Sequence, residues 1–213
     1  MILTLPNLLT LSRIAVIPLL VAACYLPYPW GNWTAWALFA LASVTDYLDG
    51  HFARLYKQTS AFGRFLDPIA DKLLVAITLM MLVDFNWMST PALFPALIIL
   101  AREILVSGLR EFLAGLRVSV PVSRLAKWKT GIQMVAIGLL LIGDAGPAVW
   151  HVRMLGELML WVAATLTLIT GYDYLRHGLK HMAETDAQAA AAATGPSPAN
   201  PATPIGKSVG GAG

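Results

Sequence analysis

Six long runs of apolar residues, separated by short polar stretches, dominate the chain. They cover residues 6–26, 33–56, 63–83, 92–115, 124–143 and 152–176. The hydrocarbon core of a bilayer is about 30 Å thick, and an α-helix of about 20 residues crosses it. Each run is long enough to do so. The pattern therefore predicts an all-α, polytopic membrane protein with six transmembrane helices.

The basic residues gather in alternate connections, which predicts an orientation. Connections 27–32 and 84–91 carry no Lys or Arg, whereas those after the second and fourth runs are basic. By the positive-inside rule, both termini lie in the cytoplasm. Residues 183–213 are rich in Ala, Gly and Pro, and we expect them to form a disordered tail behind a membrane domain of residues 1–182.

Composition agrees with a membrane protein and excludes several other classes. Of the 213 residues, 57% are hydrophobic and only 13% are charged, whereas about 25% are charged in soluble domains. The net charge of +3 comes from 15 Lys and Arg residues spread along the chain. Membrane orientation explains this excess, so no nucleic-acid partner is expected. The single cysteine excludes a cysteine-based zinc site.

Four aspartates in the second and third runs are candidates for chemistry, because ionisable residues in membrane helices are costly. Asp46 and Asp49 are three residues apart, and Asp67 and Asp71 are four apart. Each spacing places the pair on one helix face, and the short connection makes the two helices antiparallel neighbours. Clustered carboxylates need a counter-charge, and oxygen ligands suit Mg²⁺ or Mn²⁺. Two such ions are typical of sites that clamp a phosphoryl group.

The residues around the aspartates favour a pocket for a nucleotide diphosphate. Gly50 and Ala53 leave room beside Asp49, and Arg54 lies within reach of a phosphate. Gly63 opens the next helix. Two plainer interpretations stay open. The small residues are also typical of close helix packing, and the acids would also form ion pairs with neighbouring basic residues, namely Arg54, Arg64 and Lys72.

Residues 46–71 resemble the signature of the CDP-alcohol phosphotransferase family, D-x2-D-G-x2-A-R-x8-G-x3-D-x3-D, at all eight fixed positions. The resemblance implies a six-helix membrane enzyme, usually a homodimer, in the bacterial inner membrane with its active site toward the cytoplasm. Such enzymes use divalent metal to move a phosphatidyl group from a CDP-linked lipid to an alcohol, and they release CMP.

The family's residue roles carry over onto matching positions. The resemblance implies that the metal ligands are Asp46, Asp49, Asp67 and Asp71, and that Asp71 is also the catalytic general base. The residues expected to bind or flank the CDP-lipid are Asn7, Thr10, Gly50, Ala53, Arg54, Ser60 and Gly63.

Segments outside the signature suggest the acceptor alcohol. Residues 6–13, 101–111, 127–130 and 171–175 resemble bacterial family members that make phosphatidylglycerophosphate, although Ala126 replaces a glycine of their pattern. The resemblance implies CDP-diacylglycerol as donor and glycerol 3-phosphate as acceptor. The residues expected to bind the acceptor phosphate are Arg13, Arg110, Lys127 and Lys129. A cytoplasmic connection is basic in any case, so the same residues also fit a topological role.

Other functions remain as alternatives. Within the family, the acceptor would instead be phosphatidylglycerol, inositol phosphate or serine. In other classes, an ion transporter also carries membrane acids, and a prenyltransferase combines them with Mg²⁺, but neither matches the spacing of the aspartates. Arg102 and Glu103 are sequence neighbours, and we expect them to face different directions and not to pair. For Arg102, bonding to neighbouring helices and substrate contact both remain open.

Overall fold

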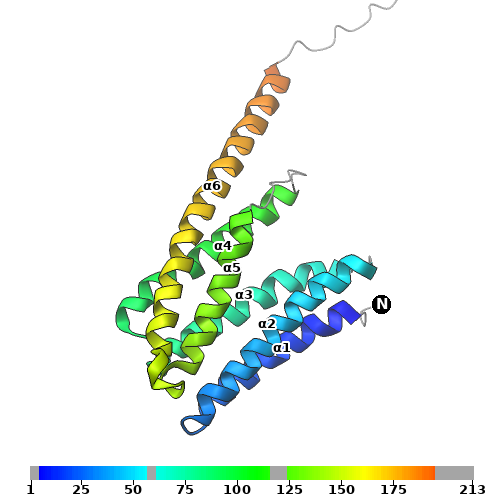
Figure 1. The fold of residues 1–213 in the computed structure, drawn as a ribbon. Helices are drawn as coiled ribbons and strands as arrows, with labels where there is room; N and C mark the ends of the chain where they lie inside the picture. Colours follow the sequence, from blue (N-terminus) through cyan, green and yellow to red (C-terminus); the bar gives the residue numbers. More distant parts are fainter. Residues whose placement is uncertain (1–4, 57–60, 116–123, 195–213) are drawn as a thin grey trace, which may run out of the picture. The chain divides into compact units, whose positions relative to one another are not determined.

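The computed structural model describes residues 5–56, 61–115 and 124–194, and within these ranges every regular element is helical (Figure 1). The six α-helices are α1 (Leu5–Cys24), α2 (Trp30–Tyr56), α3 (Ala61–Asp84), α4 (Leu93–Gly115), α5 (Arg124–Ile142) and α6 (Val152–Thr194). Short 3-10 turns lie between them: η1 (Thr90–Ala92), η2 (Gly143–Ala145) and η3 (Ala148–Trp150). The predicted all-α class is confirmed, and each helix matches one apolar run.

The end of α6 differs from the prediction. The helix continues to Thr194, well into the segment that was expected to be disordered. Residues 183–194 are mostly alanine, the residue with the highest helix propensity. Gly and Pro follow directly at 195–196, so the helix-breaking composition begins later than the predicted boundary. Within the described residues, the chain up to Gly178 forms one compact unit, and the end of α6 from Leu179 to Thr194 belongs to a second one.

Within the first unit, helix packing brings the acidic segments together. Helix α1 packs against α2 and α3, α2 also contacts α5, and α3 contacts α4 and α5. The core between them is apolar, with Leu20, Phe39, Leu82 and Leu140 almost completely buried. Helix α3 therefore occupies a position from which its residues face α1, α4 and α5.

Polar bonds fix the connections between helices. Asn32 Nδ2 donates a hydrogen bond to the Leu141 carbonyl at 2.9 Å. The backbone N–H and the hydroxyl of Ser89 donate to the two carboxylate oxygens of Glu157 at 2.7 and 2.8 Å. At Gly31, a Cβ atom would lie 2.7 Å from the Leu26 carbonyl oxygen, so the turn between α1 and α2 requires glycine. These bonds hold the helices in register at the start of α2 and around the α3–α4 connection.

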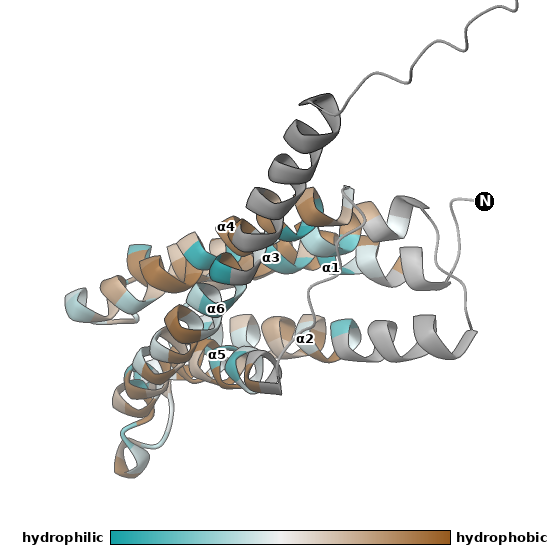
Figure 2. Ribbon diagram, turned by 90° about the horizontal axis from the view of Figure 1, so that it is seen from above, coloured by the Kyte–Doolittle hydropathy of each residue, from teal (hydrophilic) through white to brown (hydrophobic). Residues whose placement is uncertain are grey.

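Large apolar side chains are exposed on the helices, as expected for contact with lipid. Leu105, Trp128 and Met154 are each about 70% exposed, and Figure 2 shows apolar residues along much of each helix that it colours. Two helical stretches of the described chain, Thr90–Gly115 and Ala148–Arg176, are long and apolar enough to cross a membrane. Thr10–Cys24 is apolar but shorter. Helices α2 and α3 carry the aspartates, which interrupt their apolar character.

Candidate active site

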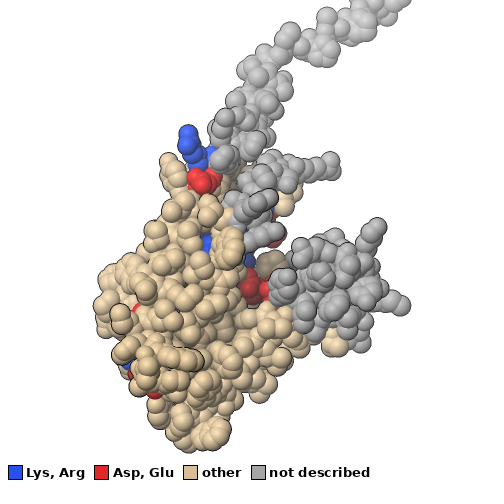
Figure 3. Space-filling model, in the orientation of Figure 1, with Lys and Arg blue, Asp and Glu red and all other residues tan. Residues whose placement is uncertain are grey.

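The described aspartates of α2 and α3 come close to one another. Asp46 lies on α2, and Asp67 and Asp71 lie one turn apart on α3. Asp46 is near enough to Asp67, and Asp71 near enough to Asp46, for their charges to interact. Figure 3 shows acidic atoms in a recess of an otherwise largely uncharged face. The three carboxylates are therefore near enough for their charges to interact, but they do not lie close enough together to form a group that holds a metal ion.

Helix α1 supplies partners for two of these carboxylates. Arg13 Nη2 lies 2.6 Å from Asp46 Oδ1, and the Thr10 hydroxyl donates a hydrogen bond to Asp67 Oδ1. Thr10 and Arg13 are three residues apart, so they share one face of α1. Both side chains are buried, with about 1% of each exposed. The first helix therefore orients the acidic residues of both neighbouring helices.

Two of the predicted site residues are more closely tied to the aspartates than the sequence indicated. Arg13 was expected at the acceptor phosphate, and here it forms an ion pair with Asp46. Thr10 was expected beside the CDP-lipid, and here it bonds to Asp67. Lys72, a suggested ion-pair partner of the aspartates, donates to the Pro68 carbonyl of its own helix at 3.1 Å. Its charge also acts on Asp71, but no ion pair between the two is found among the described residues.

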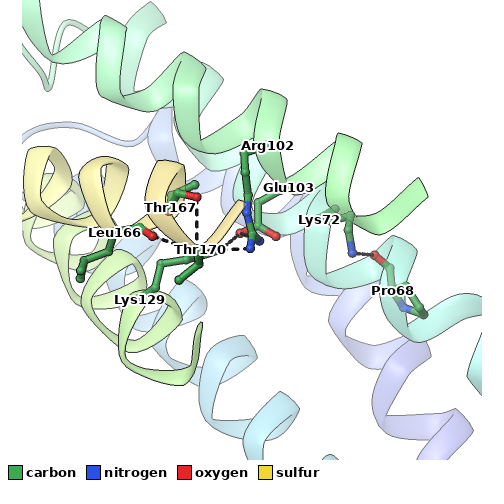
Figure 4. A network of polar contacts seen from close by, with 8 residues as sticks. All are labelled: Pro68, Lys72, Arg102, Glu103, Lys129, Leu166, Thr167 and Thr170. Carbon is green, nitrogen blue, oxygen red and sulfur yellow. Dashed lines mark hydrogen bonds and ion pairs between the residues drawn. The ribbon is translucent and has the colours of Figure 1, made fainter. Parts of the chain in front are cut away.

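A second polar cluster lies between α4, α5 and α6 (Figure 4). The Lys129 ammonium donates to Glu103 Oε1, and only 3% of the Lys129 side chain is exposed. Arg102 Nη1 lies 3.8 Å from the same Glu103 oxygen, and Arg102 Nη2 donates to Thr170 Oγ1 of α6 at 3.3 Å. Glu103 is thus shared by two cations, and Arg102 ties α4 to α6.

The expectation that Arg102 and Glu103 do not pair was wrong. Their Cβ atoms do point in different directions, but the long Arg102 side chain bends back so that one nitrogen approaches the neighbouring carboxylate at 3.8 Å. Of the two roles left open for Arg102, bonding to a neighbouring helix is the one present in the structure. Gly171 makes room for it, because a Cβ atom there would lie 2.9 Å from Arg102 Cγ.

Asp71 lies between the two polar clusters. Asp71 lines a small cavity of about 40 Å³ together with its neighbour Lys72, Glu103 of α4 and residues of α5. Among the described residues, no hydrogen bond or ion pair to Asp71 is found. One carboxylate oxygen of Asp46 and one of Asp67 are engaged by α1, whereas no such contact to Asp71 is found among the described residues.

The predicted acceptor-phosphate residues do not form one cluster in the described structure. Arg13 pairs with Asp46 and Lys129 with Glu103, whereas Arg110 lies over the Tyr174 ring, 5.8 Å from its centroid. Lys127 belongs to α5, but its side chain is not described. The structure therefore brings Lys129 close to the Asp71 cavity through Glu103, and it places Arg110 against α6.

Most of the predicted CDP-lipid residues, and Asp49, have no described side chain. Gly63 is buried in the first turn of α3. Ser60 lies outside the described residues. Five further predicted residues lie within helices, but their side chains are not described: Asn7, Asp49, Gly50, Ala53 and Arg54. Among the described side chains, no group of three or more His, Cys, Asp or Glu lies close enough to hold a metal ion. Asp49 is the fourth predicted ligand, so the full set is not described.

Sequence reasoning missed Gln133 and Thr170 and gave Glu103 no role. Gln133 is 2% exposed and Thr170 is 7% exposed, and each lies in an apolar helical segment. A polar residue inside such a segment was the available signal. Gln133 follows Lys129 by four residues, so the two share a face of α5.

Comparison with known proteins places this arrangement in a family. A model of the CDP-alcohol phosphatidyltransferase family matches residues 3–169. A protein of Rickettsia bellii named CDP-diacylglycerol–glycerol-3-phosphate 3-phosphatidyltransferase is 50% identical over 172 residues, which is 81% of this chain and 93% of the relative. A protein of the same name from Salmonella choleraesuis is 45% identical, over 80% of this chain and 92% of its own length. Another, from Cereibacter sphaeroides, is 39% identical, over 84% of this chain and 97% of its own length. The chain belongs to the CDP-alcohol phosphatidyltransferase family.

Proposed function

We propose that this enzyme transfers the phosphatidyl group of CDP-diacylglycerol to glycerol 3-phosphate, giving phosphatidylglycerophosphate and CMP. The observation that carries the proposal is the identity of 39–50% to relatives with this activity in their names, along nearly their whole length. The geometry agrees with it, since Asp71 lines a cavity together with Glu103, which is the partner of the buried Lys129. The enzyme is a transferase of phospholipid biosynthesis.

Asp71 is the proposed general base. The primary hydroxyl oxygen of the acceptor forms a bond to the lipid-linked phosphorus, and the bond from that phosphorus to the CMP oxygen breaks. The hydroxyl proton goes to the Asp71 carboxylate, and CMP leaves with the electron pair. A base must be within hydrogen-bond reach of the proton that it accepts. Asp71 lines a cavity, and no hydrogen bond or ion pair to its carboxylate is found among the described residues.

The proposed cofactor is Mg²⁺ or Mn²⁺, with two ions held by Asp46, Asp49, Asp67 and Asp71. The described members of this set offer carboxylate oxygens, which are the ligands that these ions prefer. When bound, the metal neutralises charge on the diphosphate and on departing CMP. Arg13 and Thr10 keep Asp46 and Asp67 oriented toward the cluster, so we assign Arg13 a positioning role in place of the predicted phosphate contact.

Substrate contacts complete the proposal. The CDP-lipid would be bound by residues of α1, α2 and α3 and of the α2–α3 connection, namely Asn7, Thr10, Gly50, Ala53, Arg54, Ser60 and Gly63. The acceptor phosphate would be bound by Arg110, Lys127 and Lys129. The buried Lys129 ammonium supports this assignment, because a dianion that enters the cavity competes with Glu103 for the same cation.

The proposed setting is the bacterial inner membrane. Six spans, cytoplasmic termini and an active site facing the cytoplasm fit the alternation of basic connections, and the exposed apolar side chains fit lipid contact. A homodimer is expected from the family resemblance. Labelling of single cysteines introduced at positions 28 and 112, from each side of sealed vesicles, tests the orientation.

The activity is tested by CMP release from CDP-diacylglycerol. Purified protein in detergent with Mg²⁺ receives glycerol 3-phosphate, phosphatidylglycerol, inositol phosphate or serine in parallel. The proposal expects metal-dependent release with glycerol 3-phosphate. CMP release with a different acceptor would agree with the proposed aspartate chemistry but overturn glycerol 3-phosphate as the acceptor. No CMP release from folded protein would overturn the proposed transferase activity.

A further inference from the structure

The small cavity beside Asp71 is built from three helices. The lining residues, around a volume of about 40 Å³, are Asp71, Lys72 and Val75 of α3, Leu100 and Glu103 of α4, and Thr130, Gln133 and Met134 of α5. A space of this size holds a small polar group of a ligand. It does not hold a nucleotide or an acyl chain.

Gln133 is the unusual member of this lining. Only 2% of the residue is exposed, and within the described part of the chain its Oε1 atom has no hydrogen-bond partner. Buried polar atoms in folded proteins are nearly always hydrogen-bonded. A buried amide that lines a cavity without a partner therefore indicates a ligand that supplies one.

The other groups of the cavity define the chemistry of that ligand. Glu103 already accepts from Lys129, and the Lys72 ammonium already donates to the Pro68 carbonyl. No hydrogen bond or ion pair to the Asp71 carboxylate is found among the described residues. The Asp71 carboxylate and the Gln133 carbonyl both accept hydrogen bonds. Two acceptors around one small space match a ligand that presents two neighbouring O–H donors, that is, a 1,2-diol.

The position of Lys129 sets the direction of such a ligand. Lys129 and Gln133 are one helical turn apart on α5, about 6 Å along the axis, and they share a face. A short molecule with a phosphate at one end and a diol at the other fits this order, with the phosphate toward Lys129 and the hydroxyls toward Gln133.

We propose that Gln133 determines acceptor specificity by hydrogen bonding to the hydroxyl that does not react, while the adjacent primary hydroxyl faces Asp71. The inference rests on the proposed function and names a further residue for it. Turning the amide exchanges its oxygen for its NH₂ group, which also bonds to a hydroxyl, so the assignment holds for either orientation of the amide. A site built to bond a hydroxyl discriminates strongly against an analogue that lacks it.

The test compares glycerol 3-phosphate with 3-hydroxypropyl phosphate, which keeps the phosphate and the primary hydroxyl but lacks the second hydroxyl. We expect wild-type protein to prefer glycerol 3-phosphate in kcat/KM at least about tenfold. Gln133→Met keeps the side-chain volume and removes the hydrogen bond, so this preference falls to within about twofold of unity. Gln133→Asn moves the amide back by one methylene, so we expect a preference for glycerol 3-phosphate between those of wild-type protein and Gln133→Met.

Thr167→Val is the matched control. Thr167 is also fully buried, and its Oγ1 atom also has no partner among the described residues, but it lies on α6 outside the cavity lining. This variant should leave the preference unchanged. A preference that Gln133→Met does not alter would overturn the proposal and would leave the proposed function intact.

If the variants do not fold, the acceptor preference of the wild-type protein still tests the proposed role of Gln133. A wild-type enzyme that uses both acceptors equally well would overturn the role of Gln133. A wild-type enzyme that does not use glycerol 3-phosphate at all would overturn the proposed function, and the two failures are therefore distinguishable.

Discussion

The Arg13 guanidinium lies 2.6 Å from the Asp46 carboxylate and ties the first helix to the second. Arg13 is almost completely buried, while about half of the Asp46 side chain is exposed. The cation therefore belongs to the protein interior, and the carboxylate is partly accessible from outside. This pair, with the Thr10–Asp67 hydrogen bond, makes α1 the element that orients the acidic cluster.

Replacing Arg13 should impair turnover through Asp46. Arg13→Met leaves the Asp46 carboxylate without its partner, and we expect kcat to fall at least about tenfold and stability to fall by about 1–2 kcal/mol. Because Asp46 is a proposed metal ligand, the Mg²⁺ concentration for half-maximal activity should change as well. CMP release across a Mg²⁺ titration measures both effects.

The control for Arg13 is Arg153→Ala. Arg153 also forms ion pairs, to Asp144 at 3.1 Å and to Glu157 at 3.5 Å, but its side chain is 32% exposed and lies outside the site. Exposed pairs contribute about 0–1 kcal/mol, so activity and its metal dependence should stay at wild-type values. Equal loss in both variants would mean that Arg13 acts only through general stability.

Asp71→Asn separates catalysis from binding. The change removes the proposed base, and general-base groups contribute about 10²–10⁴-fold to rate. We expect turnover to fall at least about a hundredfold. Since no partner of Asp71 is found in the described residues, thermal stability and its increase on adding CDP-diacylglycerol should persist. Near-normal turnover would remove Asp71 from the role of base.

The Glu103–Lys129 pair should be strongly coupled. Glu103→Gln leaves the Lys129 ammonium, 3% exposed, without its counter-charge, and breaking a buried pair costs about 3 kcal/mol or more. Adding Lys129→Met to this variant removes the stranded charge and should restore most of the lost stability. Thermal unfolding in detergent of Glu103→Gln, of Lys129→Met and of the double variant gives the coupling free energy between the two side chains. Additive effects would contradict a direct interaction.

Gly171→Ala should disturb the contact between α4 and α6. The new Cβ would lie 2.9 Å from Arg102 Cγ and 3.2 Å from Arg102 Nε, so the Arg102 side chain must move away from Thr170. We expect a loss of about 1–2 kcal/mol, as for other overpacked sites. Gly131→Ala is the control, because nothing lies within 4 Å of its added Cβ, and a helical Gly→Ala change there should stabilise by up to about 1 kcal/mol. Stabilisation by both changes would contradict the packing described for Arg102.

The helices and the acidic faces could be predicted from the sequence, because both depend on local spacing. Apolar runs of bilayer length indicated the six helices, and the spacing of Asp67 and Asp71 placed them on one face of α3. Partners across helices could not be predicted in this way. Arg13 bonds to Asp46 because α1 presents a particular face to α2, and that rotation is set by packing along the whole helix.

The remaining differences also have physical causes. The bend of Arg102 toward Glu103 depends on the long arginine side chain and on the space at Gly171, neither of which follows from helical periodicity. Gln133 was missed because one amide in an apolar run has no spacing signature. The extension of α6 was missed because alanine-rich sequence is compatible with both helix and disorder, whereas Gly and Pro at 195–196 mark the change more clearly.

The central claim is that this protein joins glycerol 3-phosphate to the phosphatidyl group of CDP-diacylglycerol. The most direct measurement follows radiolabelled glycerol 3-phosphate into the lipid phase, with purified protein, CDP-diacylglycerol and Mg²⁺, while CMP is quantified in the same reaction. We predict one labelled phosphatidylglycerophosphate for each CMP released, and loss of both products on adding a chelator. CMP release without labelled lipid, or no reaction from folded protein, would contradict the account.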